Sequence, residues 1–172
     1  MIVRIRPATA ADHPTLQAIE VEAGALFRDV GLPEIAEHEP FSLEELAAIP
    51  QLFVATDESG QEIVGYAALE LVDGQSHLEQ LSVRPSVGRH GVGTALLEHV
   101  ADWARARGDT GVTLTTFRDV PFNGPLYAKR GFVEVPETEW SDALRARVAE
   151  EAEMGLDPAH RLVMRRPVGG RA

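Results

Sequence analysis

The fold is decided by a stretch in the middle of the chain that reads Leu81-Ser82-Val83-Arg84-Pro85-Ser86-Val87-Gly88-Arg89-His90-Gly91-Val92-Gly93-Thr94-Ala95-Leu96-Leu97. Its first residues predict a strand that ends at Arg84-Pro85, and the spacing of Val92, Leu96 and Val100 predicts a helix. The glycines between them let the backbone approach a ligand, and the free N–H groups at a helix start favour a phosphate. A helix start that uses glycines only for packing is the alternative.

Two well-known phosphate-binding loops do not fit this stretch. A P-loop needs Lys and then Ser or Thr after its last glycine, and no Lys follows Gly93. A dinucleotide-binding fingerprint needs a third glycine near Leu96 and follows an early strand of the chain rather than a middle one. A phosphate would therefore be held here by a different kind of loop.

Outward from this loop, apolar patterning predicts alternating strands and helices. The predicted strands cover residues 2–6, 52–56, 63–71, 78–83, 112–117, 131–135 and 161–166. The predicted helices run from a capping-box-like start at Thr9 and Asp12 to Leu26, from the glycine loop to Gly108, over 121–130 and over 141–154. Residues 23–42 predict a long loop or a broken second helix. Since no repeat or linker interrupts this order, we expect one α/β sheet with helices on both faces, in a single domain over 1–172.

The composition of the chain argues against several classes of binding partner. The chain has 172 residues, 44% of them hydrophobic and 25% charged, which is typical of one soluble globular domain. Its net charge of −11 argues against nucleic acid as a partner. No stretch is typical of a signal peptide or a membrane span, and without cysteine there is no disulfide framework, so we expect a cytoplasmic protein with no membrane partner. The six histidines show no paired ligand spacing, and we expect no metal.

Two motifs in order resemble the GNAT (GCN5-related) N-acetyltransferase family. Val83-Arg84-Pro85 followed by Gly88-Arg89-His90-Gly91-Val92-Gly93 is similar to the family's Gln/Arg-x-x-Gly-x-Gly/Ala loop after a strand. About thirty residues later, Asn123-Gly124-Pro125-Leu126-Tyr127-Ala128-Lys129-Arg130-Gly131-Phe132 resembles the family's Asn-x-x-x-x-Tyr-x-x-x-Gly-Phe segment. One position departs from the pattern: Gly88 replaces the usual Gln or Arg, so that side-chain contact is absent.

The resemblance implies a fold and a cofactor. The fold would be a mixed, largely antiparallel central sheet of about seven strands, flanked by helices and splayed at its central strands. Acetyl-CoA, as the acyl donor, would bind through its pyrophosphate to the loop and through its pantetheine to the splayed strand. The cofactor-binding residues implied are Leu81, Ser82, Val83, Gly88, Arg89, His90, Gly91, Val92, Gly93, Thr94, Asn123 and Tyr127. Arg84, Arg89 and His90 would add local positive charge.

The same resemblance implies two catalytic residues. Tyr127 matches the family tyrosine that protonates the departing thiolate, with a buried core tyrosine as the alternative. Glu79 lies two residues before Leu81, so in a regular strand both side chains share a face, and Glu79 is the candidate base. A solvent-facing or ion-paired glutamate is its alternative. The N–H near Leu81 would stabilise the oxyanion, and Asn123 could instead serve as a helix N-cap.

The reaction implied is acetyl transfer to a primary amine of a small molecule, peptide or protein, by direct attack on the thioester. Eight carboxylates against one cation, Arg28, between residues 20 and 45 favour a cationic amine, with a solvated acidic surface as the alternative. They are Glu20, Glu22, Asp29, Glu34, Glu37, Glu39, Glu44 and Glu45. A non-catalytic acyl-CoA-binding regulatory module and a transferase for a longer acyl-CoA also stay open, as does a homodimer.

Overall fold

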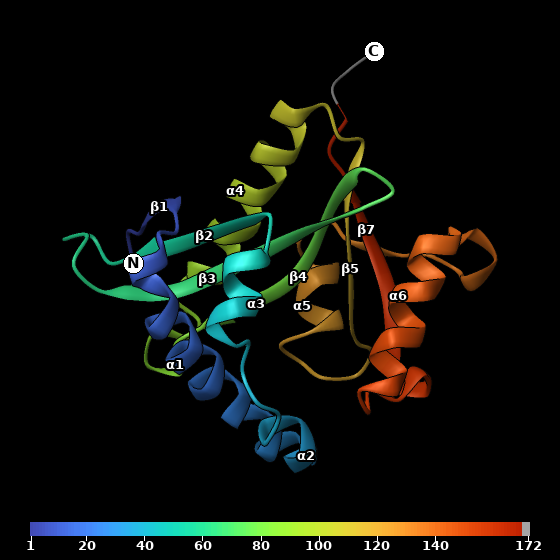
Figure 1. Cartoon of the computed structure of the whole chain (residues 1–172), viewed down its shortest axis with the longest axis horizontal. Coiled ribbons are helices and arrows are strands. Elements are labelled where there is room, and N and C mark those ends of the chain that lie inside the picture. The colour runs from blue at the N-terminus through green and yellow to red at the C-terminus, as the bar shows by residue number, and fades with distance from the viewer. Residues whose placement is uncertain (170–172) are drawn as a thin grey trace. The chain divides into compact units, whose positions relative to one another are not determined.

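The computed structural model describes residues 1–169, so the end of the predicted domain, 170–172, lies outside the described residues. The chain divides into two compact units, Met1–Leu69 with Gln80–Val100 and Glu70–Glu79 with Ala101–Ala172. Figure 1 labels the helices and strands along the chain. Among residues 1–169, no helix is both long and apolar enough to cross a membrane.

The strands form a seven-stranded sheet, as the sequence predicted, in the order β1-β2-β3-β4-β5-β7-β6. They are β1 (Arg4–Pro7), β2 (Gln51–Thr56), β3 (Ile63–Val72), β4 (Gln75–Val83), β5 (Gly111–Phe117), β6 (Val133–Glu134) and β7 (Arg161–Pro167). The pairs β1·β2, β2·β3, β5·β7 and β6·β7 are antiparallel, and β4·β5 is parallel. The expected mixed, largely antiparallel sheet is therefore confirmed.

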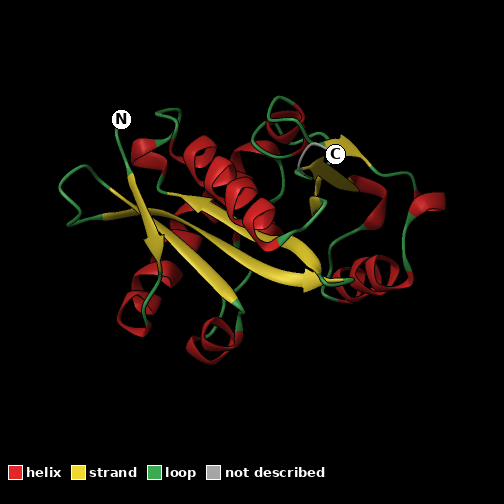
Figure 2. Cartoon of the chain, turned by 90° about the horizontal axis from the view of Figure 1, so that it is seen from above, coloured by secondary structure: helices red, strands yellow, loops and turns green. Residues whose placement is uncertain are grey.

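In the first unit, helices cover both faces of the strands (Figure 2). Its helical segments are η1 (Ala10–Asp12), α1 (His13–Gly24), η2 (Ala25–Val30), α2 (Pro33–Ala36), α3 (Leu43–Ala48), η3 (Pro85–Val87) and the first part of α4 (Val92–Arg107). Leu16 and Ile19 of α1 and Leu46 of α3 pack with Val54 of β2 in one core. The preceding β2 residue, Phe53, faces the other way and contacts His99 of α4 at 4.5 Å between ring centroids. Alternation along the strand thus supplies both helical layers.

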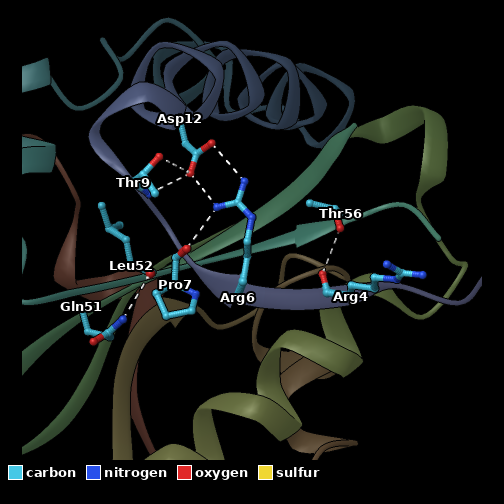
Figure 3. Close-up of polar contacts among 8 residues, drawn as sticks. All are labelled: Arg4, Arg6, Pro7, Thr9, Asp12, Gln51, Leu52 and Thr56. Carbon is cyan, nitrogen blue, oxygen red and sulfur yellow. Dashed lines mark hydrogen bonds and ion pairs between the residues drawn. The ribbon is translucent and has the colours of Figure 1, made fainter. Parts of the chain in front are cut away.

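The start of α1 is held by a charged pair that links it to β1 (Figure 3). Arg6 Nη1 and Nη2 donate to the Asp12 carboxylate at 2.7 and 3.1 Å, and the Thr9 backbone N–H donates to Asp12 Oδ2 at 2.7 Å. This confirms the capping-box-like start at Thr9 and Asp12.

In the second unit, α6 (Asp142–Glu153) lies beside β7, as Figure 1 shows. Leu144 of α6, Val163 of β7 and Val72 at the end of β3 form a core with Trp140 packed against it. The other helical segments are the last part of α4, α5 (Gly124–Ala128), η4 (Glu137–Glu139) and η5 (Pro158–His160). Ser141 caps α6 by accepting from the Leu144 N–H at 3.2 Å, close to the predicted helix start.

The ladder between β4 and β5 is short. Within residues 1–169 it consists of His77 opposite Thr113 and Leu78 opposite Leu114, although β4 continues to Val83 and β5 to Phe117. The paired part is therefore short compared with either strand, and the splay expected at the central strands stays a prediction.

Several boundaries differ from the sequence prediction. Beta4 begins at Gln75, three residues earlier than expected, because the Asp73-Gly74 turn is tight, with φ of 56° and 71°. The strand predicted over 131–135 is reduced to Val133–Glu134, and the helix predicted over 121–130 to Gly124–Ala128. The predicted broken helix over 23–42 is confirmed as η2 and α2, but α3 was missed although Ser42 and Glu45 form its capping box.

Candidate active site

The glycine loop has the backbone of an anion-binding turn. Arg89 and Gly91 adopt positive φ angles of 65° and 85°, and the first backbone hydrogen bond across the start of α4 runs from the Ala95 N–H to the Gly91 oxygen at 2.9 Å. The N–H groups of Val92, Gly93 and Thr94 therefore precede the first helical hydrogen bond and are available to a ligand. Gly88 needs no side chain for this geometry, and Arg89 and His90 are exposed.

Arg84 does not belong to the positive charge of this loop, contrary to the sequence prediction. Its Nη1 pairs with Glu22 of α1, and its Nε donates to the Ile63 carbonyl at 3.0 Å. The guanidinium is thereby neutralised and fixed to the first unit. The loop's own cation is Arg89, and His90 lies next to it in the sequence.

The strand residues Leu81, Ser82 and Val83 end β4 immediately before the loop. Ser82 is 2% exposed, and its hydroxyl accepts a hydrogen bond from the Gln80 amide at 2.8 Å and interacts with the Tyr66 hydroxyl. This side chain is therefore committed to the interior, so only the backbone of Ser82 could serve a cofactor.

Tyr127 lies on α5 in the second unit. Its side chain is buried, its ring meets Phe132 edge-on with centroids 5.6 Å apart, and burial raises the pKa of its phenol, which Arg161 partly opposes. A raised pKa keeps the phenol protonated across the physiological range, as a proton donor requires.

Asn123 stands at the N-cap position of α5, but its side chain does not cap the helix. The amide oxygen instead accepts from the Thr116 hydroxyl of β5 at 3.0 Å. The capping alternative is therefore wrong, because a side chain in β5 holds the amide oxygen.

Glu79 is neither solvent-facing nor free. Its side chain is 15% exposed, and Oε2 lies 3.3 Å from Arg147 Nη1 and 4.0 Å from His77 Nε2 without forming a hydrogen bond to either. Burial, together with the nearby Glu151 carboxylate, raises the pKa of Glu79 to about 7, and Arg161 opposes the shift. A carboxylate with that pKa can accept a proton near neutral pH.

Sequence reasoning missed the polar network beside Glu79. Glu151 of α6 accepts from the Thr115 hydroxyl at 2.6 Å and pairs with Arg161 of β7 at 3.1 Å. His77 is fully buried, contacts Thr113 Oγ1 at 2.8 Å, and burial lowers its pKa to about 4. The available signal was the spacing of Leu144, Arg147 and Glu151, which puts two charged residues on the core-facing stripe of α6.

Some of the carboxylates of residues 20–45 stabilise the fold of the first unit. Glu22 pairs with Arg84 and Glu45 accepts from the Ser42 N–H, so both serve structure. Glu20 is different: its Oε2 accepts from the Phe41 N–H at 3.1 Å and the Tyr66 hydroxyl at 2.9 Å, and burial raises the pKa of its carboxyl. Within residues 1–169, Glu20 forms no ion pair.

The described residues hold no group of three His, Asp or Glu side chains placed to bind a metal ion.

The chain is similar to several solved structures over nearly its whole length. It matches the ribosomal-protein-S18-alanine N-acetyltransferase of Escherichia coli with a TM-score of 0.69 and 19% identity, over 99% of this chain and 97% of that one. It matches the PaiA N-acetyltransferase of Thermoplasma acidophilum, solved in complex with coenzyme A, with a TM-score of 0.68 and 16% identity, over 97% and 99% of the two chains. At these identities the likeness concerns the fold.

A third structure is larger than this chain. The N-acetylglutamate synthase of Neisseria gonorrhoeae, complexed with coenzyme A and N-acetyl-glutamate, matches with a TM-score of 0.72 and 24% identity. The match covers 99% of this chain but 36% of that one.

The family model for the acetyltransferase (GNAT) family matches residues 21–132, which is more than half of the chain and includes the loop, Glu79 and Tyr127. The match, the seven-stranded sheet and the two motifs agree on one assignment: the chain is an acyltransferase that belongs to the acetyltransferase (GNAT) family.

Proposed function

We propose that this protein transfers the acetyl group of acetyl-CoA to a primary amine, acting as one N-acetyltransferase domain. The observation that carries the proposal is Glu79, a buried carboxylate whose pKa is raised to about 7. Such a group accepts protons near neutral pH, and the chain belongs to a family of acetyltransferases.

The loop supports binding of the donor. We assign the pyrophosphate of acetyl-CoA to the backbone N–H groups from Gly88 to Thr94, helped by Arg89 and His90. The positive φ at Arg89 and Gly91 is typical of loops whose successive N–H groups bind one anion. The backbone of Leu81, Ser82 and Val83 would pair with pantetheine as an added strand, and Asn123 would bind the cofactor with its remaining amide donors.

The reaction then needs the removal of two protons from the amine nitrogen, the protonation of the sulfur and one displacement. Glu79 takes a proton from the acceptor ammonium, and the amine nitrogen bonds to the thioester carbon while the N–H near Leu81 stabilises the oxyanion. The C–S bond breaks, and Tyr127 gives its proton to the sulfur. The amide nitrogen then loses its second proton, which restores the Tyr127 phenol, and Glu79 releases its own proton to solvent. The products are an amide and the free thiol of CoA.

The acceptor we propose is a cationic amine. Support comes from Glu20, a largely buried carboxylate that holds two hydrogen-bond donors and, within residues 1–169, has no cationic partner. A carboxylate of this kind is stabilised when a cation supplies the missing charge.

The test is release of CoA thiol from acetyl-CoA, followed with a thiol reagent over polyamines, amino acids, aminoglycosides, arylamines and lysine peptides. The chain has no cysteine and adds no background. Turnover above the amine-free rate with one amine class supports the enzyme and selects its acceptor. Binding of acetyl-CoA without turnover would favour the non-catalytic acyl-CoA-binding module, and faster turnover with longer acyl-CoA donors would change the donor.

Tyr127→Phe provides a second test in the same assay. Loss of the thiolate acid should lower kcat by about 10-fold to 100-fold with little change in the KM for acetyl-CoA. An unchanged kcat would mean that Tyr127 is a buried core aromatic and not the thiolate acid.

A homodimer and a cytoplasmic location remain predictions. Sedimentation velocity would check the homodimer.

A further inference from the structure

Arg147 of α6 lies between two carboxylates of neighbouring strands in the second unit. Its Nη1 is 3.3 Å from Glu79 Oε2 on β4, and its Nη2 pairs with Glu70 Oε2 on β3. All three side chains are largely covered, with exposed fractions of 20% for Arg147, 27% for Glu70 and 15% for Glu79. One guanidinium is thus shared by two partly desolvated acids.

The surroundings of Glu79 make this cation important. The charged and titratable groups that face it come from its own strand, from α6, from β7 and, through Arg147, from β3. They are His77, Arg147, Glu150, Glu151, Arg161 and Glu70. His77 is buried and neutral, and the Glu150 and Glu151 carboxylates disfavour the ionised form of Glu79. Arg161 favours the ionised form, but its guanidinium also pairs with Glu151.

The contact between Arg147 and Glu79 differs from a hydrogen-bonded buried salt bridge. Glu79 Oε2 is buried and forms no hydrogen bond, although the Arg147 nitrogen is 3.3 Å away. The same guanidinium also pairs with Glu70, so its effect on Glu79 comes from its charge and its position. A contact of this kind changes when the competing acid changes.

We propose that Arg147 is a positioning residue that holds the Glu79 carboxylate in its charged form, and that Glu70 regulates it by competing for the same guanidinium. The proposal rests on the role of Glu79 as base in the proposed function. In this proposal, the Glu70–Arg147–Glu79 triad sets the pH range in which Glu79 is ionised and can act as the base.

The triad predicts opposite effects for its two partners. Arg147→Met removes the cation, so the Glu79 titration midpoint should rise by about one unit. Glu70→Gln removes the competing charge and leaves the guanidinium to Glu79, so the midpoint should fall by about half a unit. Arg147→Lys keeps the charge and should stay near the wild-type midpoint.

The experiment that tests the triad is a ¹³C NMR titration of the whole protein labelled at glutamate carboxyl carbons, with the Glu79 signal assigned by its loss in Glu79→Gln. The matched control is Arg145→Met, which removes an arginine from the same helix whose partner is the exposed Glu137. This control should leave the Glu79 midpoint unchanged. If Arg147→Met fails to fold, Arg147→Lys and Glu70→Gln still provide the test.

Opposite shifts of the Glu79 titration midpoint in Arg147→Met and Glu70→Gln support the proposal. Midpoints that do not change, or that move in the same direction in both variants, overturn it. A second readout, the pH profile of acetyl transfer to the amine found in the CoA-release assay, separates the two proposals. If the NMR midpoints shift as expected while the rate profile does not follow them, the triad stands and Glu79 is not the base.

Discussion

Glu79 is the residue whose protonation should limit the proposed reaction near neutral pH. Burial raises its pKa to about 7, and the base acts only as the carboxylate, so kcat/KM should rise with pH through this value and level off above it. Glu79→Gln should lower kcat/KM by about 100-fold above pH 8 and abolish the limb near pH 7. The measurement is kcat/KM from pH 5 to 9.

A matched control comes from Glu58→Gln, because Glu58 is an exposed carboxylate in the β2–β3 turn. This variant should keep the wild-type profile. A limb near pH 7 that persists in Glu79→Gln would assign the titration to the acceptor amine or another group, and the base would have to be sought elsewhere.

At the scale of elements, the junction of β1 and α1 depends on Asp12. The hydrogen bonds from Arg6, with those from Thr9, lower the pKa of Asp12 to about 2, so its stabilising effect is full above pH 4 and is lost as the pH falls through 2. Asp12→Asn should therefore lower the free energy of unfolding by about 1–2 kcal/mol at pH 7, since Arg6 is partly exposed.

Urea unfolding at pH 7 and pH 3 measures this effect. The difference between Asp12→Asn and the wild type should shrink at the lower pH, and the exposed Asp29→Asn should show no comparable loss at either pH. An equal loss at both values would mean that Asp12 acts through packing and not through its charge.

Elements with a clear apolar period were predictable, whereas the capped but short α3 and the elements defined by distant partners were not. The stripe of Val92, Leu96 and Val100 predicted α4 because its period is local. The length of β6 depends on pairing with β7, where Val133 meets Arg165, and no local pattern encodes that register. The same reason separates the parts of the candidate site: the loop and Tyr127 carry motifs, whereas Arg147 gains its role only from the carboxylates it meets.

At the scale of the whole molecule, strands and helices that run through both compact units indicate that the protein unfolds as one cooperative unit. Three elements, β3, β4 and α4, each begin in one compact unit and end in the other, so neither unit can lose its hydrogen bonds without fraying a strand or helix of the second. Scanning calorimetry should therefore show a single transition, with equal calorimetric and van't Hoff enthalpies near 120 kcal/mol, from about 0.7 kcal/mol per residue.

Acetyl-CoA should move this single transition to higher temperature as its concentration rises, because a ligand that binds only the folded state stabilises every part of the protein that unfolds together with its site. Gly91→Val, which puts a β-branched side chain where φ is +85°, should reduce that shift. Two separate transitions, with acetyl-CoA moving one of them, would contradict the single domain and assign the donor to the unit that moves.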